Sequence, residues 1–130
     1  MSYKYQDLTK KIISCFYNVY NELGYGFLES VYENSIIKEF KKKNLKVQNQ
    51  KEIDVYYRNE IVGNFIADII VDDKIIIEVK AVKELKQIHE VQLVNYLKAT
   101  KIEVGLLVNF GEKLEFKRKV FTEKNIWIRL

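Results

Sequence analysis

Three charged residues stand in or beside segments of the chain that are otherwise apolar. Asp68 interrupts the β-branched run 61–71, and Glu78 and Lys80 lie at the end of a second, isoleucine-rich run. An isolated buried ion costs several kcal/mol even after relaxation, so such residues are usually paired, bound to a metal or placed at a functional site. These three residues are therefore the first candidates for chemistry.

The spacing of these residues predicts that they meet across a hairpin. Side chains alternate along a strand, so Glu78 and Lys80 project from one face. The pair Asp72 and Asp73 predicts a tight turn that returns the chain antiparallel to the strand of Asp68. Two carboxylates at such a distance repel each other, and this repulsion raises the pKa of one of them unless a cation compensates.

A hard divalent cation suits a carboxylate pair of this kind. Mg²⁺ prefers oxygen ligands and is usually held by one or two protein carboxylates together with substrate phosphate oxygens. Lys80, next to the second carboxylate, would position or help deprotonate a metal-bound water and offset phosphate charge in the transition state. The pattern indicates metal-dependent hydrolysis of a phosphate ester. The alternative without chemistry is a buried salt-bridge network in which Lys80 neutralises one acid.

Periodicity in the sequence predicts the elements that carry these residues. Apolar residues at spacings of three and four indicate helices, and alternation indicates strands. Gly24 ends the first helix, since glycine accepts the backbone conformation of a helix C-cap. We expect an α/β fold with a central mixed sheet of about five strands flanked by helices, in one domain over 1–130. The expected helices cover 7–23, 28–43 and 84–100, and the expected strands cover 53–57, 61–71 and 74–79 in an antiparallel meander, then 104–109, 114–120 and an edge strand over 127–130.

Further motifs surround the charged pattern in a fixed order. Asp68 followed by the triplet 78–80 reads D…ExK; segment 26–32 reads G-x-x-E-x-x-Y; segment 89–98 reads H-x-x-Q-x-x-x-Y-L-K; and segment 105–111 reads G-L-L-x-N-F-G. This order resembles the GxxExxY family of the PD-(D/E)XK nuclease superfamily, in its RecB-like and λ-exonuclease-like branch. The resemblance covers most of the chain, from about residue 9 to 120, and implies a restriction-endonuclease-like core.

The resemblance also implies a magnesium-dependent nuclease, a hydrolase of nucleic-acid phosphodiester bonds. One or two Mg²⁺ or Mn²⁺ ions would be held by the carboxylates of Glu29, Asp68 and Glu78 and by the carbonyl of Val79. Lys80 would prepare the attacking water. The alternative is a module on a nuclease scaffold that binds nucleic acid or a protein without cutting, because fold does not guarantee function.

The helical positions of the motifs have structural alternatives. Glu29 could be a solvated acid near a helix N-terminus, and Glu33, its i+4 neighbour, is the alternative ligand. Gln92 and Tyr96 share one helix face, from which Gln92 would orient the catalytic lysine and Tyr96 would contact the nucleic-acid backbone. His89 joins that face and would bind phosphate. For Tyr96 the alternative is core packing, and for His89 it is a structural role.

Composition bounds the partners and the setting. The net charge of +4 and a pI near 9.0 suit a polyanion, and the runs 41–43 and 117–119 are its basic clusters. Solvated faces are the alternative reading of both runs. We expect nucleic acid as the partner, DNA more than RNA, and a homodimer would let so small a domain grip both strands of a duplex.

Cysteine and apolar content limit other functions. Cys15 is the single cysteine, so no internal disulfide can form, and we expect a reducing, intracellular and cytoplasmic setting. One cysteine and one histidine cannot build a structural zinc site. No apolar run approaches the roughly 18 to 20 residues of a membrane span, so we expect no membrane partner.

Overall fold

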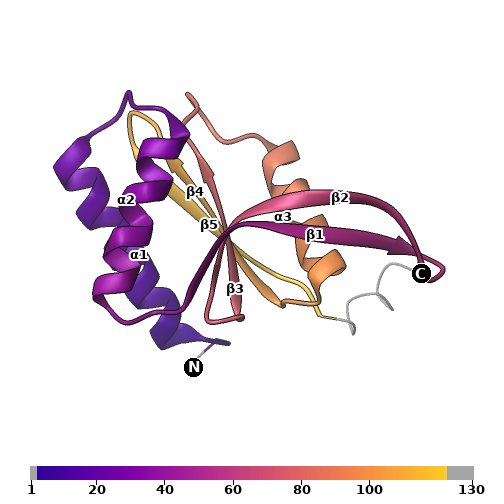
Figure 1. The fold of residues 1–130 in the computed structure, drawn as a ribbon. Coiled ribbons are helices and arrows are strands. Elements are labelled where there is room, and N and C mark those ends of the chain that lie inside the picture. Colours follow the sequence, from indigo (N-terminus) through magenta and orange to yellow (C-terminus); the bar gives the residue numbers. More distant parts are fainter. Residues whose placement is uncertain (1–2, 123–130) are drawn as a thin grey trace.

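A five-stranded mixed sheet separates two helical layers in the computed structural model, which describes residues 3–122. Two helices cover one face of the sheet, and the third covers the other face (Figure 1). Within the described range, no helix is long and apolar enough to cross a membrane. The elements in chain order are α1 (Gln6–Leu23), α2 (Glu29–Lys42), β1 (Val47–Tyr57), β2 (Glu60–Val71), β3 (Ile75–Lys80), α3 (Gln87–Thr100), β4 (Val104–Phe110) and β5 (Leu114–Val120).

The strands lie in the sheet in the order of the chain, β1-β2-β3-β4-β5. The first three form an antiparallel meander, as predicted, and β5 is antiparallel to β4. Among the strands of residues 3–122, only β3 and β4 pair in parallel, and α3 makes the crossover that a parallel pair requires. The predicted α/β class and mixed five-stranded sheet are thus confirmed.

Each face of the sheet has its own apolar core. Phe16 of α1 and Phe40 of α2 pack against the face that carries Val79. Leu93 and Leu97 of α3 pack against the opposite face. Because side chains alternate along β3, the residues before and after Val79 point away from the apolar cluster in which Val79 packs. This alternation directs Glu78 and Lys80 away from the face covered by α1 and α2.

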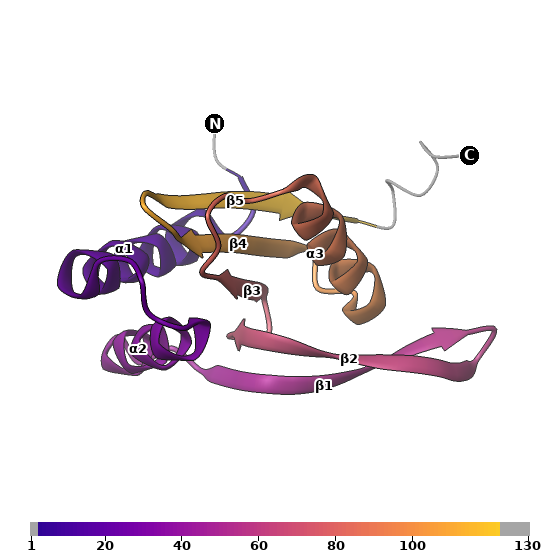
Figure 2. The same cartoon turned by 90° about the horizontal axis from the view of Figure 1, so that it is seen from above.

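The β1–β2 hairpin extends well past the helices as a two-stranded ribbon (Figure 2). It closes at Arg58 and Asn59, which have φ angles of 49° and 67°, as in a type I′ turn. The predicted hairpin turn is therefore confirmed. Tyr56 and Tyr57 are each 61% exposed near its tip. The outer ribbon consequently presents aromatic side chains to solvent.

Two element boundaries differ by more than one residue from the predicted ones. β1 begins at Val47 rather than near residue 53, because the polar stretch before Ile53 hides its strand periodicity. Helix α3 begins at Gln87 rather than near residue 84, since Lys86 is extended and its N–H donates to the His89 side chain. The predicted edge strand over 127–130 lies outside the described residues.

Helix α3 sits directly on β4 at Gly105. A Cβ atom there would lie 2.8 Å from Leu93 Cδ1 and 3.0 Å from Leu93 Cγ. We therefore expect Gly105→Ala to lower the free energy of unfolding by about 1 to 3 kcal/mol through overpacking, measured by urea denaturation. Gly63→Ala in β2 is the matched control, because nothing lies within 4 Å of its Cβ position. Equal losses in both variants would contradict the close seating of α3.

Candidate active site

The candidate site forms where β2 and β3 stop pairing. Their backbone ladder ends at Ile69 and Ile77, and the next opposed residues are Asp68 and Glu78. From that point the two carboxyl side chains, instead of backbone carbonyl groups, accept hydrogen bonds from the backbone of the opposite strand. The Asp68 N–H donates to Glu78 Oε2 at 2.9 Å, and the Val79 N–H donates to Asp68 Oδ2 at 2.8 Å. Each acid is thereby fixed to the strand of the other.

Glu33 of α2 is brought to this pair by Gln50 of β1. Gln50 Nε2 donates to both Glu33 oxygens at 3.0 Å and makes a longer contact of 3.5 Å with Asp68 Oδ1. In the β1–β2 register Gln50 falls between the pairs Asn49–Ile69 and Lys51–Ala67, at the level of Asp68. Its φ angle of 50° falls in the left-handed region, where residues other than glycine are strained. One amide therefore joins acids from a helix and a strand.

Burial and mutual repulsion make the acids hard to ionise together. Burial, followed by repulsion from Asp68, raises the pKa of Glu78 to about 8. Burial also raises the pKa of Asp68, despite the Val79 N–H and the positive charge of Lys80. The pKa of Glu33 is raised by burial as well, and the Gln50 hydrogen bond opposes that rise. A cation beside these acids would relieve the repulsion.

The donor atoms at this site fit a hard divalent cation. Among residues 3–122 no group of three or more His, Cys, Asp and Glu side chains is already gathered as a ligand set. Two carboxylates are nevertheless the usual protein share of a Mg²⁺ site, which water and substrate complete. Asp68 Oδ1 and Glu78 Oε1 are the oxygens that the backbone N–H groups do not use. The chemistry of the acid pair therefore suits Mg²⁺ or Mn²⁺.

Lys80 completes the cluster at the end of β3. It is half-buried, and its positive charge lowers the pKa of both Asp68 and Glu78 against the opposing effect of burial. Val79 between the two β3 residues is 1% exposed and packs into the opposite core, so its backbone is held in place beside the acids. The ammonium group thus lies in the electrostatic field of the acid pair.

The two acids at the start of α2 have different surroundings. Glu33 is 9% exposed and lies on the buried stripe of α2, whereas Glu29 is exposed at the first residue of the helix. Repulsion from Glu29 contributes to the raised pKa of Glu33, after burial. The structure therefore brings Glu33 into the cluster and leaves Glu29 at its solvent side. The sequence marks Glu33 for this position as an acid on the apolar stripe of the helix.

Gln50 is the member of the cluster that sequence reasoning missed. Nothing in its type or spacing marks it, because the stretch before Ile53 is polar throughout. Its position becomes evident only when β1 is extended back to Val47 and aligned with β2. The register between strands, rather than a motif, places it beside Asp68.

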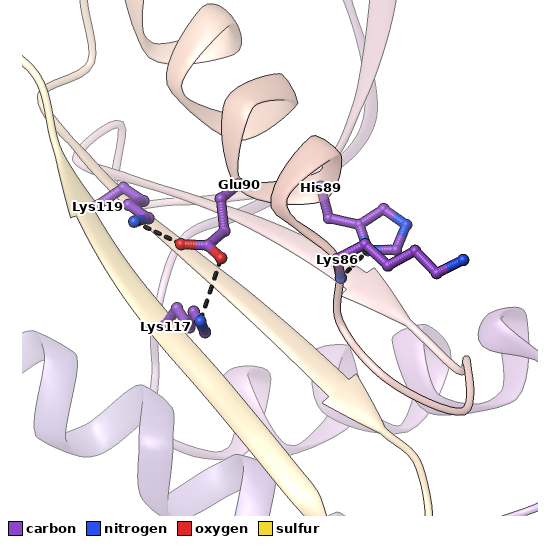
Figure 3. A network of polar contacts seen from close by, with 5 residues as sticks. All are labelled: Lys86, His89, Glu90, Lys117 and Lys119. Carbon is purple, nitrogen blue, oxygen red and sulfur yellow. Dashed lines mark hydrogen bonds and ion pairs between the residues drawn. The ribbon is translucent and has the colours of Figure 1, made fainter.

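Two of the predicted α3 residues lie apart from the acid pair's hydrogen bonds: His89 is half-buried and Gln92 faces solvent. His89 Nδ1 accepts a hydrogen bond from the Lys86 N–H at 3.1 Å, so His89 closes the start of α3 (Figure 3). Gln92 is exposed. In the described part of the chain, Gln92 makes no hydrogen bond with Lys80. The predicted phosphate contact of His89 and the support of Lys80 by Gln92 stay predictions.

Tyr96 lies between α3 and the hairpin. Its ring stacks on Phe65 of β2 with a centroid distance of 3.8 Å and an interplanar angle of 4°. Burial, and then the negative charges of Glu78 and Asp68, raise the pKa of Tyr96. Tyr96 therefore packs against the hairpin and is close enough to feel the acid pair.

The basic run 117–119 on β5 is largely engaged with other side chains. Lys117 Nζ lies 3.1 Å from Glu90 Oε2, and Lys119 Nζ lies 2.6 Å from Glu90 Oε1 (Figure 3). Arg118 lies over the Tyr3 ring at 4.2 Å. This run accordingly contributes less free positive surface than the sequence suggests.

The role of Gln50 can be separated into its amide and its backbone. Gln50→Ala and Gln50→Gly both remove the amide, and we expect each to lower the free energy of unfolding by about 1 to 2 kcal/mol in EDTA. Alanine should cost about 1 kcal/mol more, because glycine tolerates the positive φ and alanine does not. Denaturation of the two variants and wild type measures both effects. Equal stability of all three would contradict the bridging role.

Comparison with known proteins places the chain in a family. The model of the PD-(D/E)XK nuclease superfamily matches residues 6–119. Among curated proteins no sequence matches the chain. The structure is similar to the crystal structure of SSO0001, with a TM-score of 0.57 and 18% identity over 77% of this chain and 54% of that one.

A second similar structure is an alkaline exonuclease (LHK-Exo) from Laribacter hongkongensis. Its TM-score is 0.52 at 14% identity, over 72% of this chain and 55% of that one. The chain thus spans about half the length of both structures, and at such identities the likeness concerns the fold. Because the family model extends from α1 to β5, the chain belongs to the PD-(D/E)XK nuclease superfamily.

Proposed function

We propose that this protein is a metal-dependent nuclease that hydrolyses nucleic-acid phosphodiester bonds, DNA in preference to RNA. The observation that supports this proposal most is the buried pair Asp68 and Glu78, each fixed to the strand of the other, with Lys80 beside them. The superfamily membership and the likeness to an alkaline exonuclease support the same reaction.

The acids of the cluster would bind the metal ion. Asp68, Glu78 and the Val79 carbonyl would hold Mg²⁺ or Mn²⁺, with Glu33 as the helical acid in the cluster and Glu29 as the alternative from the motif. Bound there, the ion would lower the pKa of a water and stabilise charge on the phosphate.

The residues around the acid pair would handle the proton and the substrate. Lys80 would orient the attacking water and offset the charge that develops on the phosphate oxygens. Gln92 would orient Lys80 from α3. Tyr96 and His89 would contact the substrate backbone on the same side of the helix.

Finer assignments extend this proposal. The motifs support membership in the GxxExxY family, within the RecB-like and λ-exonuclease-like branch. A single domain over 1–130, a homodimer and a cytoplasmic setting stay predictions. The salt-bridge alternative is less well supported, because burial and repulsion from Asp68 hold the pKa of Glu78 at about 8 although Lys80 lowers it.

Cleavage of labelled DNA and RNA tests the proposal directly. With Mg²⁺ or Mn²⁺ we expect wild type to cleave, and we expect Asp68→Asn and Lys80→Ala to lose at least about 100-fold in rate, since the first removes a metal ligand and the second removes the group that orients the water and offsets phosphate charge. EDTA should abolish activity. Asp54→Asn and Lys83→Ala are the matched controls on exposed residues of the same types and should retain it.

The outcomes separate the alternatives. Cleavage that survives both Asp68→Asn and Lys80→Ala would rule out this site. A wild-type protein whose melting temperature rises with Mn²⁺, but which cleaves no substrate, would be the non-catalytic binding module. Absence of any metal response would support the salt-bridge network.

The helical ligand can be assigned by comparing Glu33→Gln with Glu29→Gln. Because Glu33 is buried beside Asp68 and Glu29 is exposed, we expect Glu33→Gln to reduce both the cleavage rate and the Mn²⁺-induced rise in melting temperature more strongly. Calorimetric titration with Mn²⁺ gives the affinities independently of turnover. A larger loss in Glu29→Gln would assign the metal contact to the motif position instead.

A further inference from the structure

A groove separates the outer β1–β2 hairpin from α3. Its volume is about 670 Å³. Side chains from both walls line it. Figure 2 shows the hairpin running past α3. The lining includes Tyr56, Asn64 and Phe65 of the hairpin and Asn95, Tyr96 and Lys98 of α3.

The groove adjoins the acid pair. The stacked pair Phe65 and Tyr96, with ring centroids 3.8 Å apart, contributes to its lining. Phe65 precedes Asp68 by three residues on β2, which corresponds to about 10 Å along a strand. Successive nucleotides in one strand of a duplex are about 3.4 Å apart along the helix axis, and an unpaired strand can extend further, so this distance corresponds to no more than about three nucleotides. A strand whose phosphate reaches Asp68 therefore has neighbouring nucleotides at the groove.

The chemistry of the walls matches a nucleotide with an exposed base face. Tyr56 offers an aromatic ring that is 61% exposed, and every base can stack on such a ring whatever its identity. Asn64 uses its Nδ2 to donate to Glu52 at 3.0 Å, which leaves its Oδ1 as an acceptor. Asn95 adds a second amide, and Lys98 adds a positive charge for a phosphate.

These wall properties favour an unpaired strand over a duplex. In a duplex the bases stack on one another and hide their faces, whereas unpaired bases can turn toward aromatic side chains. A purely apolar surface would suit a second copy of the chain, but this groove combines aromatic faces with two amides and a lysine. Such a combination fits the mixed chemistry of base and phosphate.

We propose that this groove binds an unpaired nucleotide of the substrate strand by stacking its base against Tyr56. The substrate is then single-stranded next to the position of cleavage. This inference rests on the proposed nuclease function and adds a substrate class to it. It commits to nucleobase and phosphate chemistry, which DNA and RNA share.

Binding of fluorescent oligonucleotides tests the groove. The probes are single-stranded oligo-dT and oligo-U and a DNA duplex, with Ca²⁺ in place of Mg²⁺ because it takes the same oxygen ligands. We expect Tyr56→Ala to weaken single-strand affinity about tenfold, as for the loss of one base–aromatic stack. Duplex affinity should stay unchanged. The relative affinities of oligo-dT and oligo-U distinguish the two sources.

Tyr57→Ala is the matched control. Tyr57 is also 61% exposed, is adjacent in β1 and does not line the groove. We expect it to change single-strand affinity less than about twofold. Asn95→Ala tests the helical wall without altering the hairpin and should also weaken single-strand binding.

Several results would contradict binding of an unpaired nucleotide in the groove. These are equal losses in Tyr56→Ala and Tyr57→Ala, an unchanged affinity in Asn95→Ala, and a loss of duplex binding as large as that of single strands. An altered oligomeric state in Tyr56→Ala with unchanged single-strand affinity would identify a contact between copies of the chain instead.

Failure of the groove differs from failure of the proposed function. Cleavage that depends on Asp68, together with wild-type affinity in Tyr56→Ala, would contradict nucleotide binding in the groove and support the nuclease activity. Single-strand binding that depends on Tyr56, in a protein that cleaves nothing, would keep the groove and remove the nuclease.

Discussion

The reciprocal hydrogen bonds between Asp68 and Glu78 are the constraint on which this structure depends. Each carboxylate accepts from a backbone N–H of the opposite strand, at 2.9 Å and 2.8 Å, where the backbone ladder of β2 and β3 ends. The two strands can therefore separate at this point without leaving those two N–H groups unpaired. The same bonds hold the two carboxyl groups close together, so two acids that repel each other when ionised share a partly buried site.

Local charges compensate this acid pair only in part. Lys80 and the backbone donors lower the pKa of Glu78, yet burial and Asp68 still hold it at about 8. Gln50 provides neutral donors to Glu33 rather than a positive charge. A structural salt-bridge network would balance its acids with bases, whereas the raised pKa values here mean that these acids do not all ionise together. A divalent cation would favour their ionised forms, and perturbed carboxyl groups of this kind concentrate at functional sites.

The sequence predicts the fold well because its elements carry strong local patterns. Helices α1 and α2 and the later strands have clear apolar periods, and charges within apolar strands mark Asp68, Glu78 and Lys80. Glu33 and Gln50 depend instead on long-range packing. Which turn of α2 faces the sheet, and which β1 residue lies opposite Asp68, follow from how complete elements dock and align. The apolar stripe of α2 marks the helix face that carries Glu33, but no local pattern fixes the strand register that places Gln50.

The separation of β2 from β3 also determines the shape of the surface beside the acids. Beyond Asp68, β2 pairs only with β1, and a two-stranded ribbon is marginally stable alone. The ribbon gains support from α3, where Phe65 stacks on Tyr96 and Ile53 joins the same apolar cluster. Tyr96 therefore serves packing, as its core spacing predicts, and at the same time holds an aromatic surface close to the acid pair. A packing role and a substrate role are compatible here, because the stacked rings join the ribbon to α3 and also line the groove.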